Sequence, residues 1–101
     1  MSKIAFVDLI KILRNNDVEI CSLKYTSDTV RDTIDIIIKV KGSFNEITSK
    51  LERLTKELKP FTKDEFNVFF LDVQSGIIDL FKKTVFLELN IFVKGINVSI
   101  E

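Results

Sequence analysis

The side chains that could do acid–base or nucleophilic chemistry are few in this sequence, and they form no motif. Histidine is absent, and Cys21 is the single cysteine. Because histidine is the commonest general base and a frequent metal ligand, zinc and haem sites and Ser–His or Cys–His catalysis lack their usual residues. One cysteine also excludes a disulfide within the chain. Cys21 lies in a predicted strand close to Glu19, so we expect a small buried apolar residue and not a reactive thiol.

Paired carboxylates are the remaining candidates for acid–base chemistry. Asp64 and Glu65 precede a predicted strand, and Asp32 and Asp35 flank polar strand positions. Carboxylates in such places are usually solvated. No acidic run has the spacing of a calcium-binding loop, and the three glycines are isolated and form no phosphate-binding loop. The sequence therefore predicts no catalytic residue, no metal ligand and no cofactor.

A small basic strip is the one feature that points toward nucleic acid. Lys39, Lys41 and Lys94 fall on one side of the predicted strands, and Tyr25 and Phe92 are placed to interleave with them, as on a single-stranded RNA platform. However, fifteen Lys and Arg residues balance fifteen Asp and Glu residues, so the formal net charge is zero. Neutrality removes the electrostatic basis of general nucleic-acid binding, and we expect none. An RNA-binding protein is the third and weakest interpretation.

The length and composition predict one globular domain over residues 1–101. The chain has a mass of 11.6 kDa, is 46% hydrophobic and 30% charged, and contains one proline. This balance excludes disordered and collagen-like classes. No run of about 18 apolar residues is present, so nothing in the chain is expected to span a bilayer.

The first half of the chain predicts a helix followed by a hairpin. Apolar residues recur at helical spacing over residues 4–13, with Ser2 as the expected N-cap and turn-forming residues at 15–17. Residues 18–26 read as a strand whose alternation slips near its middle, as a bulge would cause. Residues 33–41 form the clearest strand, and its even-numbered side chains face the core.

A second helix follows the hairpin. Gly42 ends the strand, and Ser43 with Glu46 forms a capping-box pattern. Pro60 is expected to end the helix. Its single apolar stripe predicts that the helix lies on a sheet; the stripe comprises Phe44, Ile47, Leu51, Leu54 and Leu58.

Two further strands are predicted in the last third of the chain. Residues 66–74 are apolar on both faces, which is typical of a central strand. The form of residues 77–83 stays open, as either a helical turn or a hairpin tip. Residues 84–94 form the fourth strand, with odd-numbered side chains toward the core. Gly95 is expected to turn the chain into a short edge segment over 96–100.

The resulting order, α-β-β-α-β-β, predicts an α+β fold. Two helices, each with one apolar stripe, can both bury that stripe against one face of a four-stranded antiparallel sheet. If the last strand occupies the position of the usual first strand, the chain is a circularly permuted ferredoxin-like sandwich.

The opposite face of such a sheet is the candidate partner interface. It would meet water unless another part of the chain or a partner covers it. Large apolar side chains gathered on one exposed face indicate a surface for other proteins. The residues predicted to project there are Ile37, Phe69, Leu71, Phe86 and Phe92.

The stretch from 34 to 93 resembles the soluble domain of PilO and its type II secretion counterpart GspM. The matching features are the strand that ends at Gly42–Phe44, the helix leucines Leu51 and Leu54, and the closing strand around Leu87–Ile91. The preceding helix and strand resemble the first part of the same domain. The likeness covers nearly the whole chain and consists of hydrophobic pattern plus one glycine.

This resemblance implies a non-enzymatic scaffold in the inner-membrane platform of a type IV pilus or type II secretion system. Such a protein would dimerise, pair with a PilN- or GspL-like partner of similar fold, and lie on the periplasmic side of the inner membrane. Its membrane attachment would come from a segment absent from this chain. The family has no catalytic residues to carry over.

The alternative is a cytoplasmic ACT-type regulatory domain that binds a small ligand. Such domains also use a ferredoxin-like sandwich and bind amino acids at dimer interfaces near a strand–helix turn. In this chain the turn at Asn15–Asp17 would take that part. This interpretation also requires a strand ahead of Ile4, which the sequence does not predict.

Overall fold

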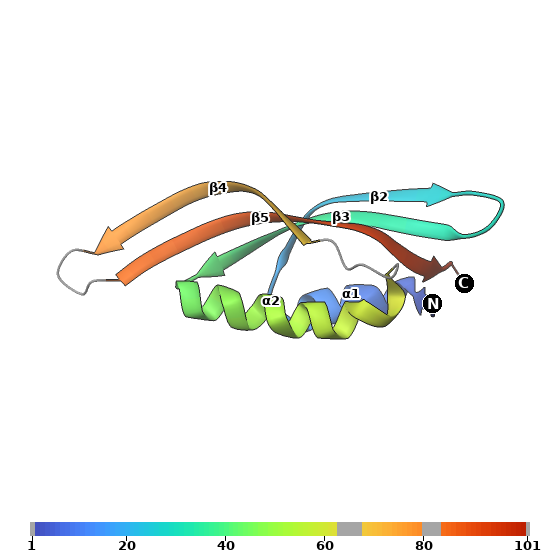
Figure 1. The fold of residues 1–101 in the computed structure, drawn as a ribbon, viewed down its shortest axis with the longest axis horizontal. Coiled ribbons are helices and arrows are strands. Elements are labelled where there is room, and N and C mark those ends of the chain that lie inside the picture. Colours follow the sequence, from blue (N-terminus) through green and yellow to red (C-terminus); the bar gives the residue numbers. More distant parts are fainter. Residues whose placement is uncertain (1, 63–67, 80–83, 101) are drawn as a thin grey trace.

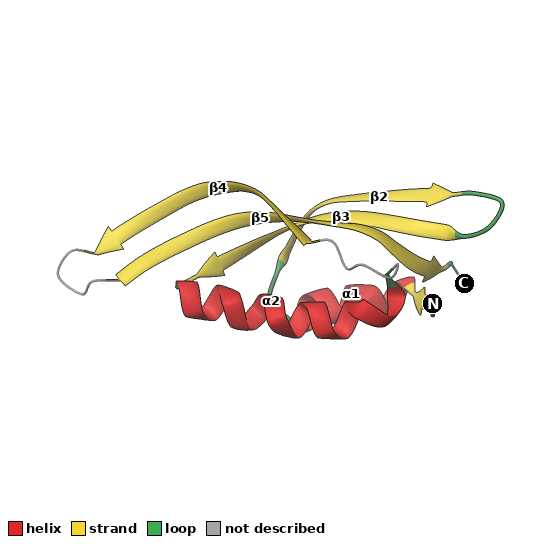
Figure 2. Ribbon diagram, in the orientation of Figure 1, coloured by secondary structure: helices red, strands yellow, loops and turns green. Residues whose placement is uncertain are grey.

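The computed structural model describes residues 2–62, 68–79 and 84–100, with the backbone alone described over 68–79 and 84–85. The predicted element order is confirmed, with one short strand added at the start (Figures 1 and 2). The elements are β1 (Ile4–Ala5), α1 (Phe6–Asn15), β2 (Glu19–Ser27), β3 (Asp32–Gly42), α2 (Phe44–Leu58), a 3₁₀ turn (Lys59–Phe61), β4 (Val68–Asp79) and β5 (Thr84–Ser99).

The sheet is mixed, so the expectation of a purely antiparallel sheet was wrong. Its strand order is β1–β5–β3–β2, and β4 also pairs with β5. The pairs β2–β3, β3–β5 and β4–β5 are antiparallel, whereas β1 runs parallel to β5 with Ile4 opposite Val98. The architecture is therefore α+β, with two helices and a mixed sheet.

The N-terminal residues explain the added strand. The Ser2 N–H donates to the Pro60 carbonyl at 3.2 Å, and Asn97 Nδ2 donates to the Ser2 carbonyl at 3.2 Å. These bonds hold the start of the chain beside β5. Ser2 is consequently not the N-cap of α1; that position is Ala5, which makes no side-chain capping bond.

The core lies between the sheet and the two helices, which both cover the same face (Figure 1). Alternate side chains of β3 and β5 form the side of the core that the sheet contributes, because every second side chain of a strand points to the same face. Ile34, Ile36, Ile38 and Val40 of β3 and Leu89, Ile91 and Val93 of β5 are buried as predicted, whereas Leu87 is half-buried. The fully buried large side chains are Leu9, Leu13, Ile34, Ile36, Ile38, Val40, Leu54, Leu58, Ile91, Val93, Ile96 and Val98.

Gly95 does not turn the chain, which corrects the prediction of a separate edge segment. It has a φ of +75°, and the register between β3 and β5 shifts at this point. The Gly95 N–H donates to Asp35 Oδ1 at 2.8 Å. After this bulge Ile96 and Val98 face the core in place of odd-numbered residues. β5 therefore continues as one long strand through the centre of the sheet.

The start of α2 was predicted correctly. The Glu46 N–H donates to Ser43 Oγ at 3.2 Å and the Ser43 N–H donates to Glu46 Oε1 at 3.4 Å, which is a capping box. The apolar stripe is confirmed in part. Leu54 and Leu58 are buried, Leu51 is half-buried, and Phe44 is 69% exposed because it lies at the open N-terminal end of the helix.

The two outer strands differ from expectation. β2 contains the predicted bulge, between Ile20 and Ser22, but Cys21 within it is exposed and not buried. β4 was predicted to be central, yet it lies at the sheet edge and among the described strands pairs with β5 alone. Its start at Phe66 and the connection over 80–83 lie outside the described residues.

Within the described residues, neither helix has the length and apolar character needed to cross a membrane.

Candidate partner-binding surface

The centre of the predicted interface is a pair of neighbouring side chains on the outer face of the sheet. Ile37 of β3 lies directly opposite Phe92 of β5, and both alternate with core residues on their strands. Both helices lie on the other face (Figure 1). Ile37 and Phe92 are half-buried, so each presents part of its apolar surface on a face that no described helix covers.

The other three predicted residues lie on β5 and β4. Phe86 is 44% exposed and lies six positions before Phe92, about 20 Å along β5. The backbone of Phe69 is opposite Phe92 in the register between β4 and β5. Leu71 falls at a bulge in β4. The side chains of Phe69 and Leu71 lie outside the description.

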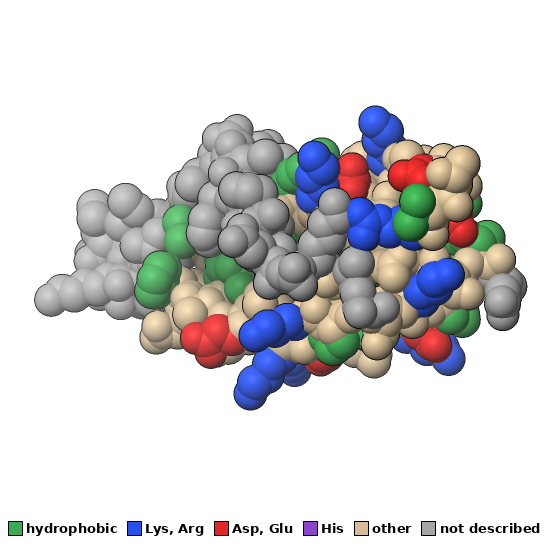
Figure 3. Space-filling view, turned by 45° about the vertical axis from the view of Figure 1, so that its right-hand side comes forward, with side chains coloured by type: hydrophobic (Ala, Val, Ile, Leu, Met, Phe, Trp, Pro, Cys, Tyr) green, Lys and Arg blue, Asp and Glu red, His purple; other side chains and the backbone are tan. Residues whose placement is uncertain are grey.

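Polar residues of mixed charge border the Ile37–Phe92 pair. Lys41 Nζ lies 3.2 Å from Glu88 Oε1, and Lys39 is opposite Asn90 in the register. Figure 3 shows Lys and Arg interspersed with Asp and Glu over the described surface in that view. An apolar centre with a polar border is the usual composition of a protein–protein interface.

The lysine strip lacks one of its two predicted aromatic residues. Tyr25 is opposite Ile34 and thus on the helix side of the sheet, away from Lys39. The slip at the bulge in β2 places it there. Its hydroxyl donates to Asp32 Oδ1 at 2.7 Å. Since Lys41 also forms an ion pair with a glutamate, the strip does not resemble a stacking platform.

The strand carboxylates Asp32 and Asp35 both accept hydrogen bonds within the chain. A hydrogen bond from the Tyr25 side chain and, to a smaller extent, one from the Ser27 side chain lower the pKa of Asp32. Asp35 accepts the Gly95 N–H within the bulge of β5. Asp64 and Glu65 lie outside the described residues.

The turn at Asn15–Asp17, the candidate ligand site of an ACT-type domain, connects α1 to β2 and contacts α2. Asn16 is 1% exposed, and its Nδ2 donates to the Ile12 carbonyl at 2.8 Å and to Glu57 Oε2 at 3.3 Å. Asp17 adopts a φ of +54° and pairs with Lys50 at 3.3 Å. The turn thus uses its polar groups mainly to attach the end of α1 to α2.

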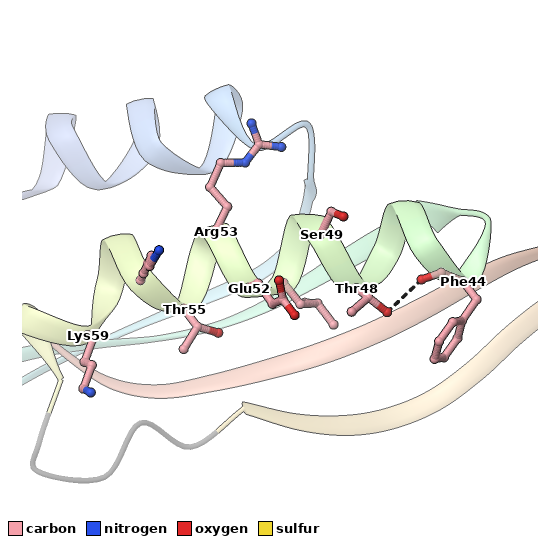
Figure 4. A pocket seen from close by; sticks show the side chains of 9 residues that line it. Phe44, Thr48, Ser49, Glu52, Arg53, Thr55 and Lys59 are labelled. Atoms are coloured by element: carbon pink, nitrogen blue, oxygen red, sulfur yellow. Dashed lines mark hydrogen bonds between the residues drawn. The ribbon is translucent and has the colours of Figure 1, made fainter.

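An open groove along α2 was not predicted from the sequence. It encloses about 910 Å³ and includes Phe44 and Leu51 among mostly polar residues. In Figure 4, Phe44, Thr48 and Thr55 extend from the side of α2 nearer β5, whereas Arg53 extends from the opposite side. The feature of the sequence that could have indicated this groove is Phe44, which was predicted to belong to the apolar stripe of the helix.

In the described part of the chain, no three His, Cys, Asp or Glu side chains come together as a metal site would require.

A smaller apolar notch was also not predicted from the sequence. It encloses about 340 Å³ beside β2 and is lined by Phe6, Leu23, Tyr25, Ile34 and Ile100. Leu23 and Tyr25 face it because the bulge moves them to the helix side of the sheet. The predicted slip in the alternation of residues 18–26 is the feature of the sequence that could have indicated this notch.

Comparison of the chain with protein-family models, with curated proteins and with solved structures finds no match.

Proposed function

We propose that this protein is a non-enzymatic scaffold domain that binds a partner protein through the outer face of its sheet. The observation that carries the proposal is the Ile37–Phe92 pair, which places apolar surface on the face opposite both helices. The mixed-charge border around Lys41 and Glu88 supports a protein partner over a nucleic acid, because it offers no net positive field.

The finer fold proposal is a circularly permuted ferredoxin-like sandwich. Leaving β1 aside, the strands lie in the order β4–β5–β3–β2 with antiparallel neighbours. This is the ferredoxin-like order when β5 is counted as the first strand. Both helices on one face also fit that fold.

The resemblance to PilO and GspM specifies the partner that we propose. It would be a soluble domain of similar fold, of the PilN or GspL type, in the inner-membrane platform of a pilus or secretion system. The domain would then work on the periplasmic side, attached through a segment outside this chain. The ACT-type alternative has less support, since Asn16 and Asp17 are engaged with α2.

Site-specific photo-crosslinking in the native host tests this proposal. The photoreactive residue p-benzoylphenylalanine would replace Phe92 on the outer face, and Arg53 on the exposed side of α2 as the matched control. We expect a crosslinked product at position 92 that contains a pilus or secretion platform protein, and much less product at position 53. Equal labelling at both positions, or products that contain only cytoplasmic enzymes, would contradict the proposal.

A further inference from the structure

β2 exposes a long free edge. It has nine residues, Glu19–Ser27, and pairs through one edge with β3 and through the other with no described strand. All of its residues except Ile20 are exposed, and none is proline. An edge of this kind presents unpaired N–H and C=O groups that can pair with another strand.

We propose that β2 pairs with β2 of a second copy of this chain, antiparallel, about a two-fold axis between Cys21 and Ser22. The two sheets then form one continuous sheet. This assignment goes beyond the proposed function, because it places self-association on the sheet edge and leaves the outer face for a different partner.

The register follows from the bulge. Glu19, Ser22 and Lys24 are opposite Lys39, Ile37 and Asp35, which places them on the outer face. Ile20, Leu23 and Tyr25 are opposite Ile38, Ile36 and Ile34, which places them on the helix face. Residues opposite each other in an antiparallel pair share a face. A two-fold axis between Cys21 and Ser22 places outer-face residues opposite outer-face residues and helix-face residues opposite helix-face residues. This holds both before and after the bulge.

The charges favour this register. The same axis sets Glu19 of each copy opposite Lys24 of the other, so two opposite-charge pairs form by symmetry. It also sets Ile20 opposite Leu23 twice. An axis through Lys24 would instead oppose two ammonium groups, which is unfavourable.

The apolar notch lies beside the same edge and gains cover in this arrangement. Leu23 and Tyr25 line it and are 38% and 46% exposed. In the proposed register they lie opposite Ile20 and Val18 of the second copy, so apolar side chains meet apolar side chains. The opposite charges of Glu19 and Lys24 on the same strand are therefore self-complementary in this register.

Charge reversal and charge exchange test the pairing by sedimentation equilibrium. Lys24→Glu and Glu19→Lys each create two like-charge pairs across the axis, and we expect each to weaken dimerisation about tenfold or more. The double variant exchanges the charges and should restore dimerisation to near the wild-type value. Lys56→Glu, a reversal of the same size on exposed α2, should have no effect.

A monomer effect must be separated from the interface effect. Glu19 and Lys24 also face Lys39 and Asp35 within the chain, so thermal unfolding of each variant is measured at a concentration where the protein is monomeric. The double variant keeps both intrachain like-charge pairs. Restored dimerisation in a less stable monomer would therefore identify the contact between copies.

Crosslinking through Cys21 provides a second readout. The thiol is exposed, and the proposed axis lies next to it, so a short bismaleimide should join two copies of the wild type and fail with Cys21→Ser and Lys24→Glu. A monomeric wild type at millimolar concentration, or a double variant no better than its parents, would overturn the inference. A dimer lost in Phe92→Asp but intact in Lys24→Glu would place self-association on the outer face and overturn the edge assignment alone.

Discussion

Truncating the apolar residues of α2 one at a time should rank them by their burial in the structure. Leu54 is 2% exposed, Leu51 is half-buried and Phe44 is 69% exposed, although all three belong to the same sequence stripe. Leu→Ala removes three carbon atoms, about 2 kcal/mol of transfer free energy, and leaves a cavity. We therefore expect Leu54→Ala to lower the free energy of unfolding by about 2–5 kcal/mol. Alanine is the best helix former, so intrinsic helix propensity does not add to this cost.

The other two variants act as internal controls. Leu51→Ala, whose place in the apolar stripe predicted the full cost of a buried leucine, should cost about 1–2 kcal/mol because part of the Leu51 side chain already meets water. Phe44→Ala should change stability by about 0.5 kcal/mol or less, as exposed substitutions do. The three variants share one helix, so differences among them report burial.

Urea unfolding followed by circular dichroism measures the series. For a domain of this size the urea m-value is about 1–2 kcal/mol per molar, so Leu54→Ala should lower the midpoint by about 2 M. A cost below about 1 kcal/mol for Leu54→Ala would refute the packing of α2 on the sheet. A cost for Phe44→Ala equal to that of Leu54→Ala would show that the start of α2 is covered.

Further substitutions test three local features, the first two by the same unfolding assay. Ser43→Ala removes the capping box and should cost about 0.5–2 kcal/mol, while Ser49→Ala at an exposed position within α2 should not destabilise. Gly95→Ala should cost about 1–2 kcal/mol through its positive φ alone, because an added Cβ meets no atom within 4 Å; Gly95→Asn should cost less. The lowered pKa of Asp32 implies a stabilising contribution that is present above the unfolded-state pKa and is lost as the pH falls through the folded-state pKa. Tyr25→Phe should raise that folded-state pKa in an NMR titration and reduce the acid-side loss of stability, and an unchanged Asp32 titration would contradict the hydrogen bond.

Local structure was largely predictable from the sequence. The capping box at Ser43 and the break at Pro60 determined the bounds of α2, because both act through backbone hydrogen bonds within a few residues. Alternation on β3 identified its buried side, since a strand against helices has one apolar face. The slip in β2 was likewise visible before its partner strand was known.

The candidate surface was only partly predictable. Ile37 and Phe92 come together because β3 pairs with β5, and a pairing between residues 55 positions apart has no local signal. Tyr25 was assigned to the lysine strip, yet one extra residue in the bulge moved it to the opposite face. Cys21 is exposed for the same reason, since a bulged residue on an edge strand has no place in the core.

The sequence by itself determined the order of the two helices and the four long strands and the apolar face of β3, because these depend on periodicity, capping and turn residues. The tertiary structure decided where each strand lies in the sheet. β4, which was predicted to be a central strand, occupies an edge, while β5 continues past Gly95 through the centre. Which strands become hydrogen-bonded neighbours in the sheet depends on the packing of the whole chain. That choice left the outer edge of β2 without a described neighbour and placed Ile37 beside Phe92 on the face opposite the helices.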